Sequence, residues 1–156
     1  MTSTRELISA AALFADAGAG AAAVSPDGEQ MAFIAAVDGV ANIHVRGLAE
    51  AAARQVTNAT GPGVHHFRWA ADSKRILFEK DAGGDECWHL HVLDLATGAE
   101  RDLTPFERIH ARVLQLSPRH PGIALVEMNL DDASRRDVWR VSLDDGDCSR
   151  VLALIR

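Results

Sequence analysis

The sequence predicts an all-β fold, a partial β-propeller of about three four-stranded antiparallel blades. One pattern of short strands and turns occurs three times, and polar turn residues separate the apolar runs throughout. The turn that opens each copy begins at Ser25, Ala70 and Ser117, so the copies lie 45 and 47 residues apart. A period in the forties with several short strands per repeat is typical of propellers.

The first copy contains the clearest turn signals. Ser25-Pro26-Asp27-Gly28 predicts a tight turn, because proline presets φ, aspartate accepts backbone hydrogen bonds and glycine tolerates a positive φ. Asp38-Gly39 predicts a two-residue hairpin. Between these turns the apolar residues recur at strand spacing. The strands predicted for this copy are 22–24, 31–37, 41–46 and 54–57.

The second and third copies repeat this order with different turns. In the second, Asp72-Ser73-Lys74 replaces the first turn, and 81–86 form a long hairpin tip. In the third, 117–122 form the first turn and Asp144-Asp145-Gly146-Asp147 the hairpin tip. The strands predicted are 65–70, 75–80, 88–95 and 100–104 in the second copy, and 109–116, 123–129, 137–143 and 148–155 in the third.

The predicted domains follow from these copies. Residues 1–20 form an N-terminal extension rich in Ala and Gly, with a short helix predicted over 4–14. Residues 21–156 form the partial propeller. Its blades are predicted at about 21–60, 61–107 and 108–156.

The composition limits the classes of partner and the compartment. The chain has 156 residues and a net charge of -6, which argues against nucleic acid or an anionic membrane as the partner. Cys87 and Cys148 make no disulfide framework, so we expect reduced thiols and a cytoplasmic protein. A secreted or periplasmic location is the less favoured alternative, because Glu6 adjoins the short apolar run at 7–15.

Several segments, taken in order, resemble the N-terminal propeller of prolyl-oligopeptidase-family serine peptidases. The dipeptidyl aminopeptidase and acylaminoacyl peptidase branch is the most similar. The resemblance covers roughly residues 20–152, and periplasmic TolB-type propellers share its first turn. The segments that carry it are Ser25-Pro26-Asp27-Gly28, Leu77-Phe78-Glu79-Lys80-Asp81, Gly84-Asp85-Glu86, Trp88-His89-Leu90 and Asp137-Val138-Trp139-Arg140-Val141.

The resemblance implies a propeller that covers a hydrolase active site and restricts access to short peptides. The catalytic residues of that family lie in an α/β-hydrolase domain, and no serine here has glycine both two residues before and two residues after it. We therefore expect a non-catalytic chain with no cofactor. The alternatives are a TolB-like protein-binding module and a truncated remnant without independent function. The open blade edges predict association with a second copy or with a hydrolase domain in trans.

The hairpin tip supplies the candidate substrate-binding residues, Asp85 and Glu86. Paired carboxylates can bind a substrate ammonium group, as some relatives do for peptide N-termini. The alternative is a solvated turn in which a carboxylate caps nearby backbone amides. The sequence leaves both open.

The histidines and tryptophans are interpreted as structural. His89 and His91 share one face of a strand, but a metal site needs a third ligand, and His44 occupies the position equivalent to His91. We therefore predict no metal site. His65 and His66 are adjacent, so their side chains should diverge in a strand. Aromatic residues at strand positions most often pack between blades, which we expect for Trp69, Trp88 and Trp139.

Overall fold

The protein folds into three antiparallel four-stranded sheets, which confirms the predicted fold class. The structure, a computed structural model, describes residues 19–81 and 84–153, so the helix predicted over 4–14 lies outside the described residues. The strands of the first sheet are β1 (Ala19–Val24), β2 (Gln30–Val37), β3 (Val40–Gly47) and β4 (Arg54–Gln55). Those of the second sheet are β5 (His66–Trp69), β6 (Arg75–Lys80), β7 (His89–Asp94) and β8 (Glu100–Asp102). Those of the third are β9 (Ala111–Ser117), β10 (His120–Met128), β11 (Asp137–Ser142) and β12 (Cys148–Leu152).

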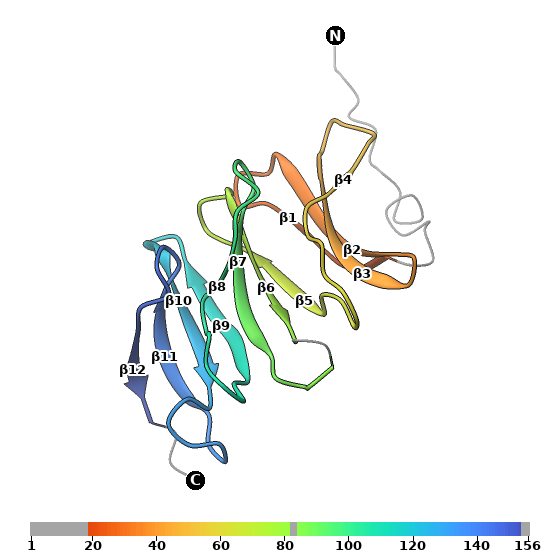
Figure 1. The fold of residues 1–156 in the computed structure, drawn as a ribbon. Helices are drawn as coiled ribbons and strands as arrows, with labels where there is room; N and C mark the ends of the chain where they lie inside the picture. The colour runs from red at the N-terminus through yellow and green to blue at the C-terminus, as the bar shows by residue number, and fades with distance from the viewer. Residues whose placement is uncertain (1–18, 82–83, 154–156) are drawn as a thin grey trace.

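The sheets stand side by side, with the second between the first and the third (Figure 1). In each sheet the strands follow one another in sequence order, so every connection inside a sheet is a hairpin. The described residues include no helix long and apolar enough to cross a membrane.

The turn after the first strand forms as its residue types predict. The Gly28 N–H donates to the Ser25 carbonyl at 2.9 Å, and Gly28 has φ +76°. Asp27 Oδ1 accepts a hydrogen bond from the Glu29 N–H at 3.0 Å, so a side chain as well as the backbone stabilises the turn. In the second sheet Ser73 takes the equivalent position with φ +58°, although serine adopts this conformation less readily than glycine.

One predicted turn is wrong at its end. We expected the turn 117–122 to precede a strand at 123–129, but β10 begins at His120, which pairs directly with Ser117. The strand accommodates Pro121 because the β9–β10 register shifts between His120 and Ala124. Proline is tolerated at such irregular positions, where it need not donate to the ladder.

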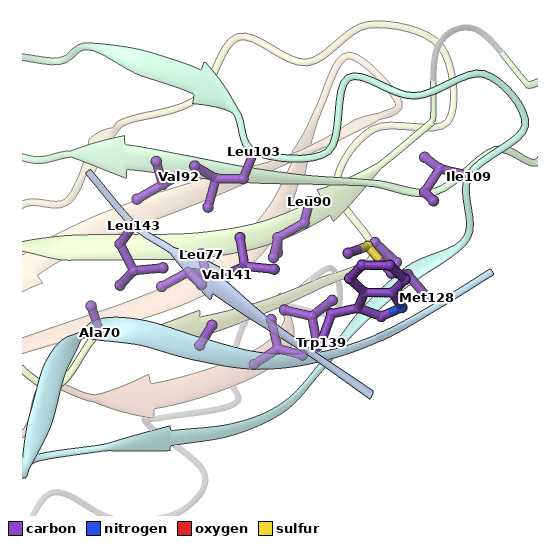
Figure 2. Close-up of a cluster of buried hydrophobic side chains, with 14 residues drawn as sticks. Ala70, Leu77, Leu90, Val92, Leu103, Ile109, Met128, Trp139, Val141 and Leu143 are labelled. Carbon is purple, nitrogen blue, oxygen red and sulfur yellow. The ribbon is translucent and has the colours of Figure 1, made fainter. Parts of the chain in front are cut away.

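Two apolar cores join consecutive sheets. Side chains of β6 alternate, so that Leu77 faces the third sheet while Ile76 and Phe78 face the first, and all three are almost fully buried. Figure 2 shows the core between the second and third sheets, where Trp139 and Met128 pack. Each buried side chain of this size contributes about 1.5–3 kcal/mol. The second sheet is therefore covered on both faces.

Polar contacts also cross from sheet to sheet. The Trp69 indole Nε1–H donates to the Ala23 carbonyl at 3.0 Å, from the second sheet to the first. Arg75 lies 2.7 Å from Asp144, which connects the second sheet to a hairpin of the third. These contacts fix how neighbouring sheets are placed.

Candidate functional site

The predicted candidates Asp85 and Glu86 lie on the connection between β6 and β7. Asp85 Oδ1 accepts a hydrogen bond from the Cys87 N–H at 3.0 Å, and both acidic residues are exposed. Capping of a backbone amide is one of the two roles that the sequence left open for this pair, the other being ligand binding. Glu86 has φ +61°, so the chain turns sharply here. Binding of an ammonium group by these two carboxylates stays a prediction.

A cleft of about 260 Å³ opens nearby, where the second and third sheets meet. It lies at the end of the sheets where the connections β4–β5, β6–β7, β8–β9 and β10–β11 come together. An adjoining hollow of about 210 Å³ shares His66, Glu79 and Arg112 with it, so the two form one groove along β5 and β9. The cleft is lined by His65, His66, Glu79, Trp88, His110, Ala111, Arg112 and Arg136.

Backbone contacts hold the walls of this cleft in place. The Trp88 carbonyl accepts from the Ala111 N–H at 2.8 Å, which joins the β6–β7 connection to the start of β9. The Trp88 ring meets the His65 ring edge to face, with centroids 4.6 Å apart. On the other side, Asn129 Oδ1 accepts from the His110 N–H at 2.7 Å. Trp88, through Ala111, and His110, through Asn129, are thus both anchored to the third sheet.

Glu79 is the one carboxylate among the described lining residues, and it is already engaged. Its Oε1 accepts from the Val113 N–H at 3.2 Å, across the boundary between the second and third sheets. Burial raises the pKa of the Glu79 carboxyl above its ordinary range. The Val113 N–H and nearby cationic side chains act in the opposite direction, but burial is the larger effect.

The charges at the cleft are mixed. Arg112 and Arg136 meet two carboxylates: Glu79 lines the cleft, and Glu127 lies opposite Arg112 in the β9–β10 register, with its Oε1 4.0 Å from Arg136 Nη1. The positive charges of the two arginines are therefore balanced by neighbouring carboxylates.

The histidines considered for a metal lie elsewhere, on β7. His89 Nδ1 lies 2.9 Å from Asp102, and His91 Nδ1 lies 3.0 Å from Glu100. His91 also stacks on a phenylalanine of β6, as His44 stacks on one of β2, so the equivalence inferred from the repeat is confirmed. In the ranges that the structure describes, no group of three His, Cys, Asp or Glu side chains could hold a metal ion.

Two sequence interpretations need correction here. His65 and His66 were expected to diverge, but both line the cleft, because His65 precedes β5 and the alternation of a strand does not apply to it. Trp69 and Trp139 pack between sheets as expected, whereas Trp88 is only half-buried and lines the cleft. A repeat in the sequence could have indicated which residues line the cleft. His66 and Arg112 lie 46 residues apart and occupy equivalent places near the start of β5 and β9, the first strands of the second and third sheets.

Comparison with known proteins identifies one close relative by sequence. Dipeptidyl aminopeptidase BIII of Pseudoxanthomonas mexicana is 41% identical over 142 residues, which are 90% of this chain and 21% of that protein. The chain therefore spans about a fifth of the length of its relative. No model of a known protein family matches the sequence.

Solved structures show the same fold. TolB from Acinetobacter baumannii superposes with a TM-score of 0.66 at 23% identity, over 86% of this chain and 32% of that one. The β-propeller domain of the Trilobed protease from Pyrococcus furiosus gives a TM-score of 0.65 at 16% identity, over 88% of this chain and 44% of that one. The chain is thus a partial β-propeller homologous to a dipeptidyl aminopeptidase, and its resemblance to the propeller of prolyl-oligopeptidase-family peptidases is confirmed.

Proposed function

We propose that this chain is a non-catalytic propeller segment that restricts the access of peptides to the active site of a serine peptidase. The observation that carries the proposal is the 41% identity to dipeptidyl aminopeptidase BIII over nine-tenths of the chain. The structural likeness to TolB concerns the fold alone, since its identity is 23%. Sequence identity therefore favours the peptidase role over a TolB-like binding role.

The packing of the sheets suits a passive barrier. A size filter must keep its shape when a substrate presses on it. Here two apolar cores and several inter-sheet hydrogen bonds hold the sheets together. Ser25 and Ser73 are both buried: the Ser25 hydroxyl bonds to Asp27 and Gln30 within its own turn, and Ser73 Oγ accepts from the Asp27 N–H across sheets. These contacts support a structural role for the turns.

A chimera tests the proposal. The 142-residue segment of dipeptidyl aminopeptidase BIII that matches this chain is replaced by the chain itself. We expect the chimera to hydrolyse a dipeptidyl 4-nitroanilide and to leave casein intact, and the isolated chain to hydrolyse neither. The matched control is the same chimera carrying Leu77→Ala, which loosens the core between the second and third sheets by about 2–5 kcal/mol.

The outcomes separate clearly. If the sheets act as a barrier, the control should gain activity on casein relative to the chimera. A chimera that cleaves casein and the short substrate equally well contradicts the proposal. So does a folded chimera without activity, because the segment would then fail to replace its relative.

A further inference from the structure

The exposed apolar side chains of this protein gather on its two end sheets (Figure 1). In the part of the chain that the structure describes, six large apolar side chains are exposed, and none of them belongs to the second sheet. Three lie in or directly beside strands of the first sheet and three in strands of the third: Val24, Val37 and Leu48, and Leu114, Val151 and Leu152. Exposed apolar side chains gathered in this way mark surfaces at which a protein associates.

Leu125 lies on the outer face of the third sheet. Its neighbours Ala124 and Val126 are fully buried in the core with the second sheet, so Leu125 points outward by the alternation of a strand. Leu77 in β6 and Ala32 in β2 also point toward the following sheet, and they are 1% and 0% exposed because that sheet covers them. Leu125 is only half-buried. The outer face of the third sheet is therefore the kind of surface that a following sheet covers elsewhere in this protein.

A groove of about 560 Å³ runs over this outer face. Ile123, Leu125 and Val151 supply its apolar lining, and Val151 is 59% exposed. The volume lies within the range of about 300–1,000 Å³ that is usual for binding sites. The groove can therefore take large apolar side chains from a partner.

The outer face of the first sheet carries the ring pair that the second sheet presents to the first. Phe33 stacks on His44 with centroids 5.6 Å apart, as Phe78 stacks on His91 at 5.4 Å. Phe78 is 1% exposed because it packs in the core with the first sheet. Phe33 points away from that core, since Ala32 beside it points inward. The first sheet therefore offers outward the kind of face that covers a preceding sheet.

Two exposed side chains of the first sheet support this comparison. Val24 and Trp69 each precede the first turn of their sheet, and Trp69 is 7% exposed against the first sheet whereas Val24 is 52% exposed. Leu48 and Leu95 also correspond, because the N–H of each donates to a carbonyl directly after that turn. Leu95 packs against the core between the first two sheets, whereas Leu48 is 38% exposed. Both exposed residues occupy places that are covered in the second sheet.

A polar contact supports the same pairing of faces. Glu79 of the second sheet accepts a hydrogen bond from the Val113 N–H of the third, at 3.2 Å. Glu127 takes the place of Glu79 on the third sheet, because each pairs with the same position of the next strand. It neighbours two arginines, with Arg136 Nη1 4.0 Å from its Oε1, but a carboxylate has about four acceptor positions, so it can accept a further N–H. The equivalent donor on the first sheet is the N–H of Ala22, an exposed residue of β1.

We propose that the outer face of the third sheet binds the outer face of the first sheet of a second copy of this chain. The occupant follows from the repeat, because both described sheet boundaries join these same two kinds of face. A head-to-tail pair buries both outer faces of both copies, and its six sheets, three from each copy, fall within the range of about 4–8 blades in which propellers close. The inference goes beyond the proposed function and does not rest on it.

Light scattering after size-exclusion chromatography measures the assembly of the full chain. We expect one species with the mass of two chains, against 16.8 kDa for one, that dissociates reversibly on dilution. A closed ring stops at two copies, so the mass should not rise further as the concentration increases.

Two arginine substitutions test the two faces separately. Val24→Arg places a charge on the outer face of the first sheet and Val151→Arg on that of the third, and the folded chain tolerates both because both side chains are more than half exposed. Each variant alone should dimerise about a hundredfold more weakly or less, since both contacts of the ring then bury a charge. An equal mixture should recover dimers, because the intact face of one variant meets the intact face of the other. The matched control Ala99→Arg, on the exposed β7–β8 turn, should leave the dimer unchanged.

Four outcomes would overturn the inference. A monomer at all concentrations removes the interface, and a mass that keeps growing with concentration shows a contact that does not close. A dimer that survives Val24→Arg or Val151→Arg uses other faces. A mixture of the two variants that stays monomeric excludes the head-to-tail pairing. Circular dichroism checks the fold of each variant, and Leu48→Arg and Leu152→Arg, on the same two sheets, replace any variant that fails to fold.

Discussion

Gly63 is the residue whose replacement should most directly separate the first sheet from the second. It has φ +82° and lies against the backbone of β3, with a bridge to Ala41. A Cβ at this position would lie 2.4 Å from the Ala41 carbonyl oxygen and 2.7 Å from the Ala41 nitrogen. Both atoms belong to the backbone of β3, where Ala41 is held by its pairing with Ala36 of β2, so the loop around Gly63 has to move away.

The magnitude of the effect follows from what that movement breaks. The positive φ costs about 1–2 kcal/mol once a Cβ is present. Moving the loop also loses the hydrogen bond from the Val64 N–H to the Ala41 carbonyl, 2.9 Å long and worth about 1 kcal/mol. Val64 is 2% exposed in the core between the first two sheets, and its partial displacement costs about 1 kcal/mol more. We expect Gly63→Ala to destabilise the protein by about 3–4 kcal/mol.

Gly28→Ala is the matched control, because Gly28 also has a positive φ of +76° but no atom lies within 4 Å of the place its Cβ would take. Only the backbone cost remains there, about 1–2 kcal/mol. Urea unfolding followed by tryptophan fluorescence measures both, since Trp69 reports on the same core. If the two variants lose stability to within about 0.5 kcal/mol of each other, the close approach to β3 does not carry the effect and the reasoning fails.

Three further predictions concern contacts within and between sheets. The His91 imidazole, with its Nδ1 3.0 Å from Glu100 Oε1, and the Lys80 ammonium lower the pKa of Glu100 to about 2. The resulting stabilisation of the folded state is present above about pH 4.5 and is lost as the pH falls toward 2. After a discount for the partial exposure of Glu100, it amounts to about 1–2 kcal/mol. Glu100→Gln should remove this part of the pH dependence of the free energy of unfolding in urea. An unchanged pH profile in the variant would count against it. Trp69→Phe should cost about 1 kcal/mol in thermal unfolding by removing the bond to the Ala23 carbonyl, and no loss would show that the bond is not formed. A double-mutant cycle of Arg75→Gln and Asp144→Asn should give a coupling energy of about 0.5–1 kcal/mol, and additive losses would exclude the inter-sheet ion pair.

The sequence predicted the three sheets because their signals are local. The turn at Ser25-Pro26-Asp27-Gly28 and the hairpin at Asp38-Gly39 are determined by neighbouring residues, and both formed. The start of β10 was misplaced because Pro121 is usually read as ending a turn. Whether a strand tolerates proline depends on the partner strand's register, which is not local information.

The cleft could not be predicted in the same way. Its lining residues come from separate connections, and their closeness depends on how the second sheet packs against the third. Trp88 was expected to pack like Trp69 and Trp139, since all three start or lie within predicted strands. What distinguishes Trp88 is the position of its backbone against Ala111, a tertiary contact.

The two cores have a consequence for how the protein opens. Each core joins one pair of consecutive sheets, so the stack behaves as a one-dimensional array in which stability is set by neighbours. Amide hydrogens of β6 and β7, in the sheet covered on both faces, should exchange with solvent most slowly. Exchange should be fastest in the two-residue β4 and in β12, where Val151 and Leu152 are exposed. Opening would then begin at β4 and β12, and the cleft between the second and third sheets would persist until these two sheets separate.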